Sequence, residues 1–378
     1  MRLRYGMVGG ATKSYIGDVH FHAIQAENQA DLLAGCFSRN QKKNQKTAAL
    51  RNMPDPNRLY SNFHEMAQKE AQREDGIDFV VICTPNDSHY EVAKCFMEHG
   101  IDVVCEKPLA ITVKQAEELG VLVKEKNIIF GMTYAYTGYA AIRQGREMIR
   151  NGRIGDILHV RVEHPEDWTI SSIDADTKVA GWRYDPRIVG PSLACGDLGS
   201  HAEQMLVQFT GLHIKRVLAM FDIYPRNLVL ETNATVLLDL GKGISGQLWA
   251  SQIASGRECS PSIYVIGTEG SLEWHHERPG ELIYAKRNGT IEHMTVGRSY
   301  MSSASNYLTR LSYGHPEGFF EAFSNIYRQY FDALSLKKQG KPLPETFPFP
   351  TITDGIAGQK FIAACVKSNQ RGNVWVEV

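Results

Sequence analysis

The chain of 378 residues is long for a single hydrophobic core and fits two domains. Its formal net charge of −1 excludes the basic footprint of a nucleic-acid-binding protein or of a surface that attracts anionic membranes. With 43% hydrophobic and 22% charged residues it is globular in composition, and no apolar run reaches the length of a membrane span or resembles a signal peptide. We therefore expect no nucleic-acid partner and no membrane partner.

The seven cysteines are odd in number, scattered, and without the spacing of a metal site. Three of them, Cys36, Cys83 and Cys105, lie inside apolar runs, which is typical of buried reduced thiols. The adjacent pair His275-His276 lacks the helical ligand spacing of a zinc site. These features predict a cytoplasmic protein with no bound metal.

The first third of the chain alternates short apolar runs with helical stretches. Strands are predicted at residues 3–9, 32–37, 79–83, 101–105 and 128–132, and helices at 16–26 and 113–126. This alternation indicates an α/β domain with a doubly wound parallel sheet. The strands are apolar throughout, as expected when both faces of a sheet are covered. A Rossmann-type dinucleotide-binding domain is therefore expected over residues 1–133.

After residue 133 the pattern changes to that of an α+β domain. A helix at 140–150 and a strand at 157–162 precede a polar segment, 163–195, that is long enough to be functional. Strand-like runs separated by short turns then predict an open antiparallel sheet, at residues 214–224, 233–240, 244–251, 262–266, 271–274 and 281–287. Helices at 316–337 and 354–368 follow. We expect a substrate-binding and oligomerisation domain at 134–345, and a C-terminal helical segment, 346–378, that completes the first domain.

The first predicted strand runs into a glycine turn, Gly9-Gly10-Ala11-Thr12-Lys13. Such a turn between a first strand and a first helix lets backbone N–H groups approach a pyrophosphate. A tight structural turn is the alternative, but the position at the first βα junction favours a nucleotide site. Lys13 either pairs with phosphate or is solvated. The predicted cofactor contacts are Gly9, Gly10, Ala11, Lys13, Ser14, Tyr15 and Ile16.

The second predicted strand ends in Ser38-Arg39, where NAD-preferring sites usually carry an acidic residue. An Arg at this position favours the 2′-phosphate of NADP. The Lys42-Lys43 pair that follows is also typical of a solvated helix start. The cofactor is therefore expected to be NADP or NAD, with a leaning towards NADP.

The fourth predicted strand leads into Glu106-Lys107-Pro108. Because proline cannot extend a sheet ladder, the chain turns there and leaves Lys107 at the carboxyl end of a parallel strand. Open α/β sheets bind their ligands at this edge. A surface lysine after a strand is the alternative interpretation.

A second polar cluster, from Gly196 to His201, contains Asp197 and His201 four residues apart. A lysine at a sheet edge and an Asp-x-x-x-His pair suggest proton-transfer chemistry beside a nucleotide, and the pKa of a histidine suits that task without tuning. In a helix, Asp197 would share a face with His201, and the Lys107 ammonium would stabilise developing alkoxide charge. The alternatives are an exposed helix histidine and an aspartate that serves as a helix N-cap.

Together these features resemble the glucose-fructose oxidoreductase / inositol dehydrogenase / rhizopine catabolism (GFO/IDH/MocA) family over essentially the whole chain. The resemblance rests on the glycine turn and on four motifs: Thr84-Pro85-Asn86-x-x-His89, Glu106-Lys107-Pro108, Trp182-Arg183 and Gly196-Asp197-x-x-x-His201. Ala11 and Lys13 depart from the family's phosphate loop. The resemblance implies a cis Lys107–Pro108 peptide and a substrate pocket lined by Lys107, Asp197 and His201, with the histidine as acid/base.

The same resemblance implies further contacts to the nicotinamide cofactor, namely Thr84, Pro85, Asn86, His89, Glu106, Lys107, Trp182 and Arg183. The structural alternatives are that Glu106 pairs with a nearby lysine or arginine and that Trp182 packs on the sheet. His164, Asp167 and Trp168 combine hydrogen-bonding groups with a flat aromatic face, which suits a polyol. Tyr136, Lys178 and His315 are further substrate-binding candidates and are equally compatible with ordinary structural roles.

The sequence therefore predicts an NAD(P)-dependent oxidoreductase that interconverts a hydroxyl and a carbonyl on a sugar, sugar derivative or inositol. His201 is the expected acid/base, with Lys107 and Asp197. Two alternatives stay open: an NAD-dependent glycoside hydrolase or lyase that uses transient oxidation, and a non-catalytic nucleotide-sensing regulatory protein. Because large apolar patches are rarely left in water, the open sheet predicts a homodimer or homotetramer.

Overall fold

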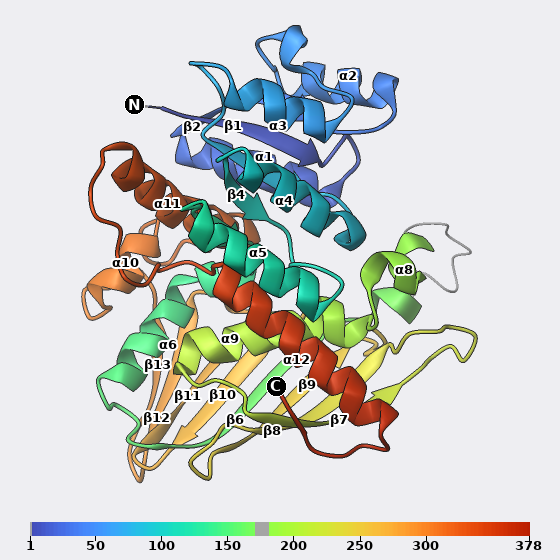
Figure 1. Ribbon diagram of the computed structural model, residues 1–378. Coiled ribbons are helices and arrows are strands. Elements are labelled where there is room, and N and C mark those ends of the chain that lie inside the picture. The colour runs from blue at the N-terminus through green and yellow to red at the C-terminus, as the bar shows by residue number, and fades with distance from the viewer. Residues whose placement is uncertain (1, 171–180) are drawn as a thin grey trace. The chain divides into compact units, whose positions relative to one another are not determined.

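The computed structural model describes residues 2–170 and 181–378 (Figure 1). The chain forms two compact units, the first made of Met1–Tyr134 and Phe323–Ile356, the second of Ala135–Ala322 and Ala357–Val378. None of the helices in the described part of the chain is both long and apolar enough to traverse a bilayer. All seven cysteines have free thiols.

Two long helices are each divided between the units, which differs from the boundary expected near residue 346. Helix α11 (Phe319–Lys338) belongs to the first unit from Phe323 onward, and α12 (Ile352–Gln370) belongs to the second from Ala357 onward. Packing explains the division. The α11 rings of Tyr330 and Phe331 lie within 5.6 Å, centroid to centroid, of the Phe79 ring of the first unit, whereas Phe361 in α12 joins the core of the second.

The first unit contains a five-stranded parallel sheet in the order β2-β1-β3-β4-β5, as the sequence predicts. Both β3 and β4 are buried along their whole length, because helices cover each face of a doubly wound sheet. The strand order reverses between β1 and β3, which makes that junction the topological switch point. The strands are β1 (Leu3–Gly9), β2 (Ala30–Cys36), β3 (Phe79–Cys83), β4 (Asp102–Cys105) and β5 (Phe130–Met132).

The helices of this unit include three that the sequence analysis does not single out, α2, α3 and α4. Asn40 and Asn62 cap α2 and α3 by accepting backbone N–H bonds. The helical segments are α1 (Tyr15–Glu27), α2 (Gln41–Leu50), η1 (Pro56–Arg58), α3 (Phe63–Ala71), η2 (Asn86–Ser88), α4 (His89–Glu98) and α5 (Val113–Glu125).

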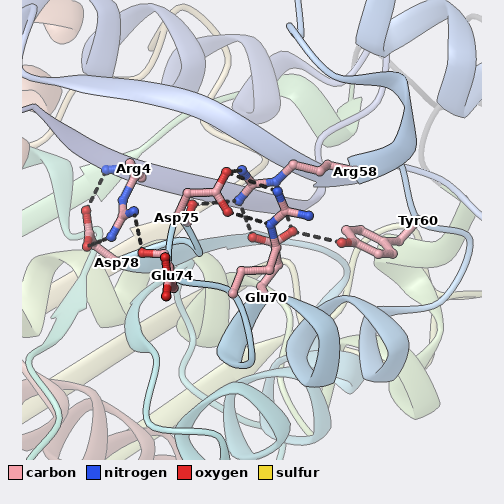
Figure 2. Close-up of polar contacts among 8 residues, drawn as sticks. Arg4, Arg58, Tyr60, Glu70, Glu74, Asp75 and Asp78 are labelled. Carbon is pink, nitrogen blue, oxygen red and sulfur yellow. Dashed lines mark hydrogen bonds and ion pairs between the residues drawn. The ribbon is translucent and has the colours of Figure 1, made fainter.

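A buried ion pair anchors the segment between α2 and α3 (Figure 2). The Arg58 guanidinium donates to both carboxylate oxygens of Glu70, and the Tyr60 hydroxyl donates to Oε1 of Glu70 at 2.8 Å. Burial, together with this bond, raises the pKa of the Tyr60 hydroxyl. The Tyr60 backbone N–H also donates to the Gly35 carbonyl of β2 at 2.8 Å. Removing one partner of a buried pair leaves an uncompensated charge, so this network fixes the segment to the sheet.

The second unit contains a nine-stranded sheet in the order β13-β12-β11-β10-β6-β9-β8-β7-β14. Adjacent strands in this sheet are antiparallel, with one exception: β6 and β9 pair in parallel, from His159↔Ser245 to Pro165↔Ser251. The expected open antiparallel sheet is therefore a mixed sheet, because β6 enters between β9 and β10 instead of extending a hairpin series. The strands are β6 (Ile157–Pro165), β7 (Arg216–Asp222), β8 (Asn233–Asp239), β9 (Ser245–Ser251), β10 (Ser262–Gly267), β11 (Gly270–His275), β12 (Glu281–Lys286), β13 (Ile291–Thr295) and β14 (Val376–Glu377).

Helices α6 and α9 lie on one face of this sheet (Figure 1). The core between them contains Val160 and Val162 of β6, Val236 of β8 and Phe209 of α9. The opposite face of the sheet is partly exposed to solvent. Burial accordingly alternates along β8, where Val236 and Leu238 are buried and Leu237 between them is exposed. The helical segments are η3 (Ala135–Gly138), α6 (Ala140–Arg150), η4 (Gly181–Tyr184), α8 (Pro186–Val189), η5 (Cys195–Gly199), α9 (Ser200–Thr210) and α10 (Ser303–Leu308).

Candidate active site

The carboxyl edge of the parallel sheet begins with the glycine turn after β1. Gly9 and Gly10 have positive φ values of 82° and 66°. A Cβ on Gly9 would lie 2.5 Å from the carbonyl oxygen of Cys83, and a Cβ on Gly17 would lie 2.3 Å from the Gly10 Cα. The first glycine therefore lets the β1 end approach β3, and Gly17 lets α1 pack closely on the turn. This is the backbone cradle that a pyrophosphate requires.

Lys13 lies in the same turn with a φ of 72°, a left-handed conformation that costs a non-glycine residue free energy. Its side chain is exposed. Ser14 follows as the N-cap of α1, and its Oγ accepts a bond from the Gly17 N–H at 3.3 Å. Tyr15 is exposed at the first turn of α1, and Ala11 is buried beneath the loop.

Arg51, which the sequence analysis did not single out, stabilises this turn through a hydrogen bond and an ion pair. Its Nη2 donates to the Gly10 carbonyl oxygen at 2.6 Å and lies 3.2 Å from the Asp18 carboxylate. The buried guanidinium lies over the rings of Phe21 and Phe37, 5.2 and 5.3 Å from their centroids. Arg51 is the C-cap residue of α2, so no local motif links it to the glycine turn.

Ser38 and Arg39 follow the end of β2 at the same edge, because β1 and β2 are parallel neighbours. The Ser38 hydroxyl accepts a bond from the Asn40 N–H at 3.1 Å, and Asn40 in turn caps α2. The Arg39 side chain is exposed. The turn is thus ordered by its own bonds, and it carries the exposed Arg39 at the end of the strand that neighbours β1.

The β3 end carries Thr84, Pro85 and Asn86. The Thr84 hydroxyl is buried and has no hydrogen-bond partner among residues 2–170 and 181–378. Below it, the fully buried His89 places Nε2 2.9 Å from the Thr84 carbonyl and Nδ1 2.8 Å from the Pro108 carbonyl. Burial lowers the pKa of His89, against the opposing effect of these two carbonyls. His89 therefore connects the segments that follow β3 and β4, and the Thr84 hydroxyl can still form a hydrogen bond.

Glu106 at the β4 end is buried and multiply bonded. Its Oε1 lies 3.0 Å from His20 Nε2 and accepts the Thr133 hydroxyl at 2.5 Å, and His20 Nδ1 lies 2.5 Å from the Tyr327 hydroxyl. Burial raises the pKa of Glu106, but its bonds and charge interactions with His20, Lys107 and Thr133 outweigh burial and leave the pKa below its usual value. One partner of Glu106 is thus a histidine, His20, that the sequence analysis did not assign to the site.

Lys107 is half-buried, and its backbone N–H donates to Glu106 Oε2 at 3.2 Å. The Lys107–Pro108 peptide is cis, so that prediction is confirmed.

In the second unit, Asp197 lies in the π-helical turn η5, which runs directly into α9. The N-cap position of α9 is Gly199, so the alternative that made Asp197 a helix cap is wrong. Asp197 Oδ2 accepts from Arg183 Nη1 and from Gln252 Nε2, both at 3.4 Å.

A buried carboxylate, Glu231, supports this segment. Its Oε1 accepts from the Ser192 hydroxyl at 2.5 Å and from the backbone N–H groups of Leu193 and Cys195 at 3.1 and 3.0 Å. Three donors at the start of the η5–α9 segment therefore share one acceptor.

Three predicted site residues of the second unit meet around the Tyr136 ring. His201 and His164 each lie edge-on to that ring, with centroids 4.9 and 5.0 Å away, and their own centroids are 5.7 Å apart. The Tyr136 hydroxyl lies 3.1 Å from the Sγ of Cys259, a residue that the sequence analysis placed with the other thiols. Burial, followed by the influence of Cys259, raises the pKa of Tyr136.

An aromatic group lies around Arg183. Its guanidinium lies 5.6 Å from the Trp168 ring centroid and 4.9 Å from that of Trp182, while Trp168 packs against Tyr184. Arg183 therefore links these rings to Asp197.

The remaining substrate candidates are more dispersed. Asp167 accepts the Gly256 N–H at 3.3 Å. His315 is exposed, and its ring bonds the Ser312 carbonyl within its own turn. Lys178 lies outside the described residues.

Known proteins match both units. Residues 3–134 match the model described as oxidoreductase family, NAD-binding Rossmann fold, and residues 142–273 match the GFO/IDH/MocA C-terminal domain. The chain is 34% identical to the oxidoreductase YfiI of Bacillus subtilis over 99% of this chain and 96% of that protein.

Two solved structures cover 100% of this chain and 98% of their own. Both are of an inositol dehydrogenase homolog from Azotobacter vinelandii, one complexed with NAD+ (32% identity, TM-score 0.95) and one with NADH and myo-inositol (31% identity, TM-score 0.93). Together with the glycine cradle and the Lys107, Asp197 and His201 motifs, these matches show that the chain belongs to the GFO/IDH/MocA family of oxidoreductases, with an NAD-binding Rossmann fold in its first unit.

Proposed function

We propose that this oxidoreductase interconverts a hydroxyl and a carbonyl on an inositol, a sugar or a sugar derivative, with His201 as the acid/base. The observation that carries the proposal is the gathering of His201, Tyr136 and His164 in the second unit, beside the helical segment that also bears Asp197. Imidazole and phenol groups suit the hydroxyls of a polyol, and an aromatic ring suits its C–H face. The similarity to a structure complexed with NADH and myo-inositol supports the same substrate class.

The residues of the first unit fit a nicotinamide dinucleotide. Gly9 and Gly17 let β3 and α1 approach the turn more closely than any Cβ would allow, and the buried Thr84 hydroxyl still has a hydrogen bond to make. Gly9 and Gly10 would let the pyrophosphate approach the backbone of the turn, and Thr84 would contact the nicotinamide half at the switch point. When bound, this cofactor accepts or supplies the hydride.

The protein's own side chains handle the proton. In oxidation, His201 Nδ1 or Nε2 takes the proton from the substrate hydroxyl, and in reduction the imidazolium returns it. Asp197, held by Arg183 and Gln252, orients the substrate or the imidazole. The Lys107 ammonium stabilises the developing negative charge on the oxygen.

A substrate screen tests this proposal. Purified protein is incubated with a panel of inositols, aldoses, ketoses and glycosides, each with NAD+ and with NADP+, and the absorbance of the reduced nicotinamide is recorded. We expect turnover with at least one cyclic polyol or sugar and none with simple linear alcohols. Release of a glycoside's aglycone without net reduction of the cofactor would instead favour the transient-oxidation hydrolase or lyase.

Arg39 supports a cofactor preference for NADP within this function. A charge-assisted bond to the 2′-phosphate contributes about 1.5–3 kcal/mol, so Arg39→Ala should weaken NADP binding about tenfold or more and leave NAD binding unchanged. Lys42→Ala removes an exposed cation three residues later and is the matched control. Equal dissociation constants of the unaltered protein for NAD and NADP would contradict the preference.

A further inference from the structure

Three side chains of different chemistry converge where β6 ends and where the loop after β9 returns towards it. One nitrogen of His164, one carboxylate oxygen of Glu166 and the sulfur of Cys259 lie within 4.8 Å of one another. The His164 Nε2 to Cys259 Sγ distance is 3.7 Å. Tetrahedral zinc with ordinary bond lengths places a nitrogen and a sulfur ligand about 3.6 Å apart. The spacing of this pair therefore fits two ligands of one tetrahedral zinc ion.

Main-chain hydrogen bonds hold the two segments in this arrangement. The Glu166 N–H donates to the Ser251 carbonyl at 2.7 Å, and the Glu166 carbonyl accepts the Ala254 N–H at 3.0 Å. The Ser260 N–H, next to Cys259, donates to the Pro165 carbonyl at 3.0 Å. The three ligand-bearing residues thus lie on a backbone that is ordered by its own bonds, which is what a preformed binding site requires.

Cys259 has a left-handed backbone conformation with a φ of 59°. A non-glycine residue in this region stores strain and persists only where its surroundings over-determine it, a feature that is concentrated at functional sites. His164 is fully buried, whereas Glu166 and Cys259 are half-buried, so the group combines a rigid inner ligand with two that solvent reaches.

We propose that His164, Glu166 and Cys259 form a binding site for Zn²⁺, with three protein ligands and one open coordination position. A thiolate and an imidazole select zinc over Mg²⁺ and Ca²⁺, which prefer oxygen ligands. The Tyr136 hydroxyl, 3.1 Å from the Cys259 sulfur, serves as an outer-shell partner of that ligand. The zinc site shares His164 and Tyr136 with the proposed substrate pocket, but its test needs no substrate and no cofactor, so its failure would leave the proposed function standing.

Metal titration of the chelator-treated protein at neutral pH tests this site. Zn²⁺ is titrated by calorimetry, and Co²⁺ is titrated while the sulfur-to-cobalt charge-transfer absorption is recorded. We expect one tight site per chain and an absorption band that saturates at the same stoichiometry. Cys259→Ser should abolish the band, and Glu166→Gln should weaken Zn²⁺ binding about tenfold or more while the band persists at saturating Co²⁺.

Cys95→Ser is the matched control. In the first unit, His64 Nδ1 lies 3.3 Å from Cys95 Sγ, so the chain offers a second cysteine–histidine pair, but within the described ranges it has no third ligand of the kind that Glu166 supplies. This variant should bind Zn²⁺ and Co²⁺ as the unaltered chain does.

The inference is overturned if the unaltered protein binds no Zn²⁺ at micromolar concentration, or if neither Cys259→Ser nor Glu166→Gln changes the affinity. Circular dichroism of each variant checks its fold. Should the serine variant fail to fold, Glu166→Gln keeps the thiol and the side-chain shape and decides the question by itself.

Discussion

At the scale of single residues, His201 is the first to test. Replacing it with alanine removes the imidazole that packs against Tyr136 and His164. Loss of a general acid/base lowers turnover by roughly 10²–10⁴-fold. Binding of the cofactor, measured by nicotinamide fluorescence, should be unchanged, since these contacts lie in the second unit.

His213→Ala provides the matched control for that experiment. His213 is an exposed histidine shortly after α9 in the same unit, and its removal should leave turnover unchanged. Near-normal turnover of His201→Ala on the true substrate would assign the proton transfer to another residue.

Lys13 combines an unfavourable backbone conformation with a position in the glycine turn. Lys13→Gly relieves the left-handed strain and should raise the free energy of unfolding by about 1 kcal/mol, measured by urea titration. The same change removes an ammonium that can pair with the pyrophosphate, so the affinity for NAD(P) should fall severalfold.

Lys242→Gly separates these two effects. Lys242 is an exposed lysine with a φ of 54° in the turn between β8 and β9. Its replacement should give a similar gain in stability with no change in cofactor affinity. If Lys13→Gly left the affinity unaltered as well, Lys13 would be simply solvated.

Residues that act through local motifs could be read from the sequence, and those that act through tertiary contacts could not. Asp197 and His201 are only four residues apart, and the residues of the glycine turn are consecutive in the sequence, so both patterns could be recognised. Arg51 reaches Gly10 across 41 residues, and Cys259 reaches His164 across 95, with no pattern that relates them. Contacts of this kind follow only from strand order and helix packing.

At the scale of elements, the η5–α9 segment depends on the buried carboxylate of Glu231. In Glu231→Ala the Ser192 hydroxyl and the N–H groups of Leu193 and Cys195 lose their acceptor. Unsatisfied buried donors cost about 1–3 kcal/mol each, so we expect a loss of roughly 2–4 kcal/mol in urea unfolding, together with reduced turnover. Glu231→Gln keeps an acceptor oxygen and should lose much less.

The same residue predicts a pH dependence. Burial raises the pKa of Glu231 above its usual value of 4.5, against the opposing effect of its hydrogen bonds. The folded protein therefore holds this proton more tightly than the unfolded chain. The stability contributed by the protonated group is fully present below pH 4.5 and is lost as the pH rises through the folded-state pKa. Measured against pH, the difference in unfolding free energy between the unaltered protein and Glu231→Gln should show this fall; a flat difference would contradict the raised pKa.

The elements themselves were predictable wherever their pattern was local. The five strands of the first sheet appear as mostly apolar runs, and the parallel sheet follows from their alternation with helices. Helix α2, with the sequence QKKNQKTAAL, is mostly polar and shows little apolar periodicity, so its caps are its main signal. The parallel pairing of β6 with β9 joins residues that are 86 positions apart in the chain, and nothing in either strand specifies that partner.

At the scale of the whole molecule, the nine-stranded sheet carries apolar side chains on the face opposite α6 and α9. Leu218 pairs directly with Leu237, and Met220 lies in the same row as Trp249 through their shared neighbour Thr235. Met220 and Leu237 are 48% and 43% exposed. Neighbouring apolar side chains that face solvent mark an interaction surface.

We propose that two copies of the chain associate through this face, as a dimer or within a tetramer. In a two-fold interface each residue occurs twice, so Leu237→Lys would introduce two charges into one contact and should shift the light-scattering mass towards a single chain. Val121→Lys, at a 57% exposed position of α5 in the first unit, is the control that should keep the assembly intact. A mass of one chain for the unaltered protein at micromolar concentration would refute the association. A multimer that persists in Leu237→Lys would place the interface on another surface, and the exposed leucine and methionine would then be ordinary solvated residues.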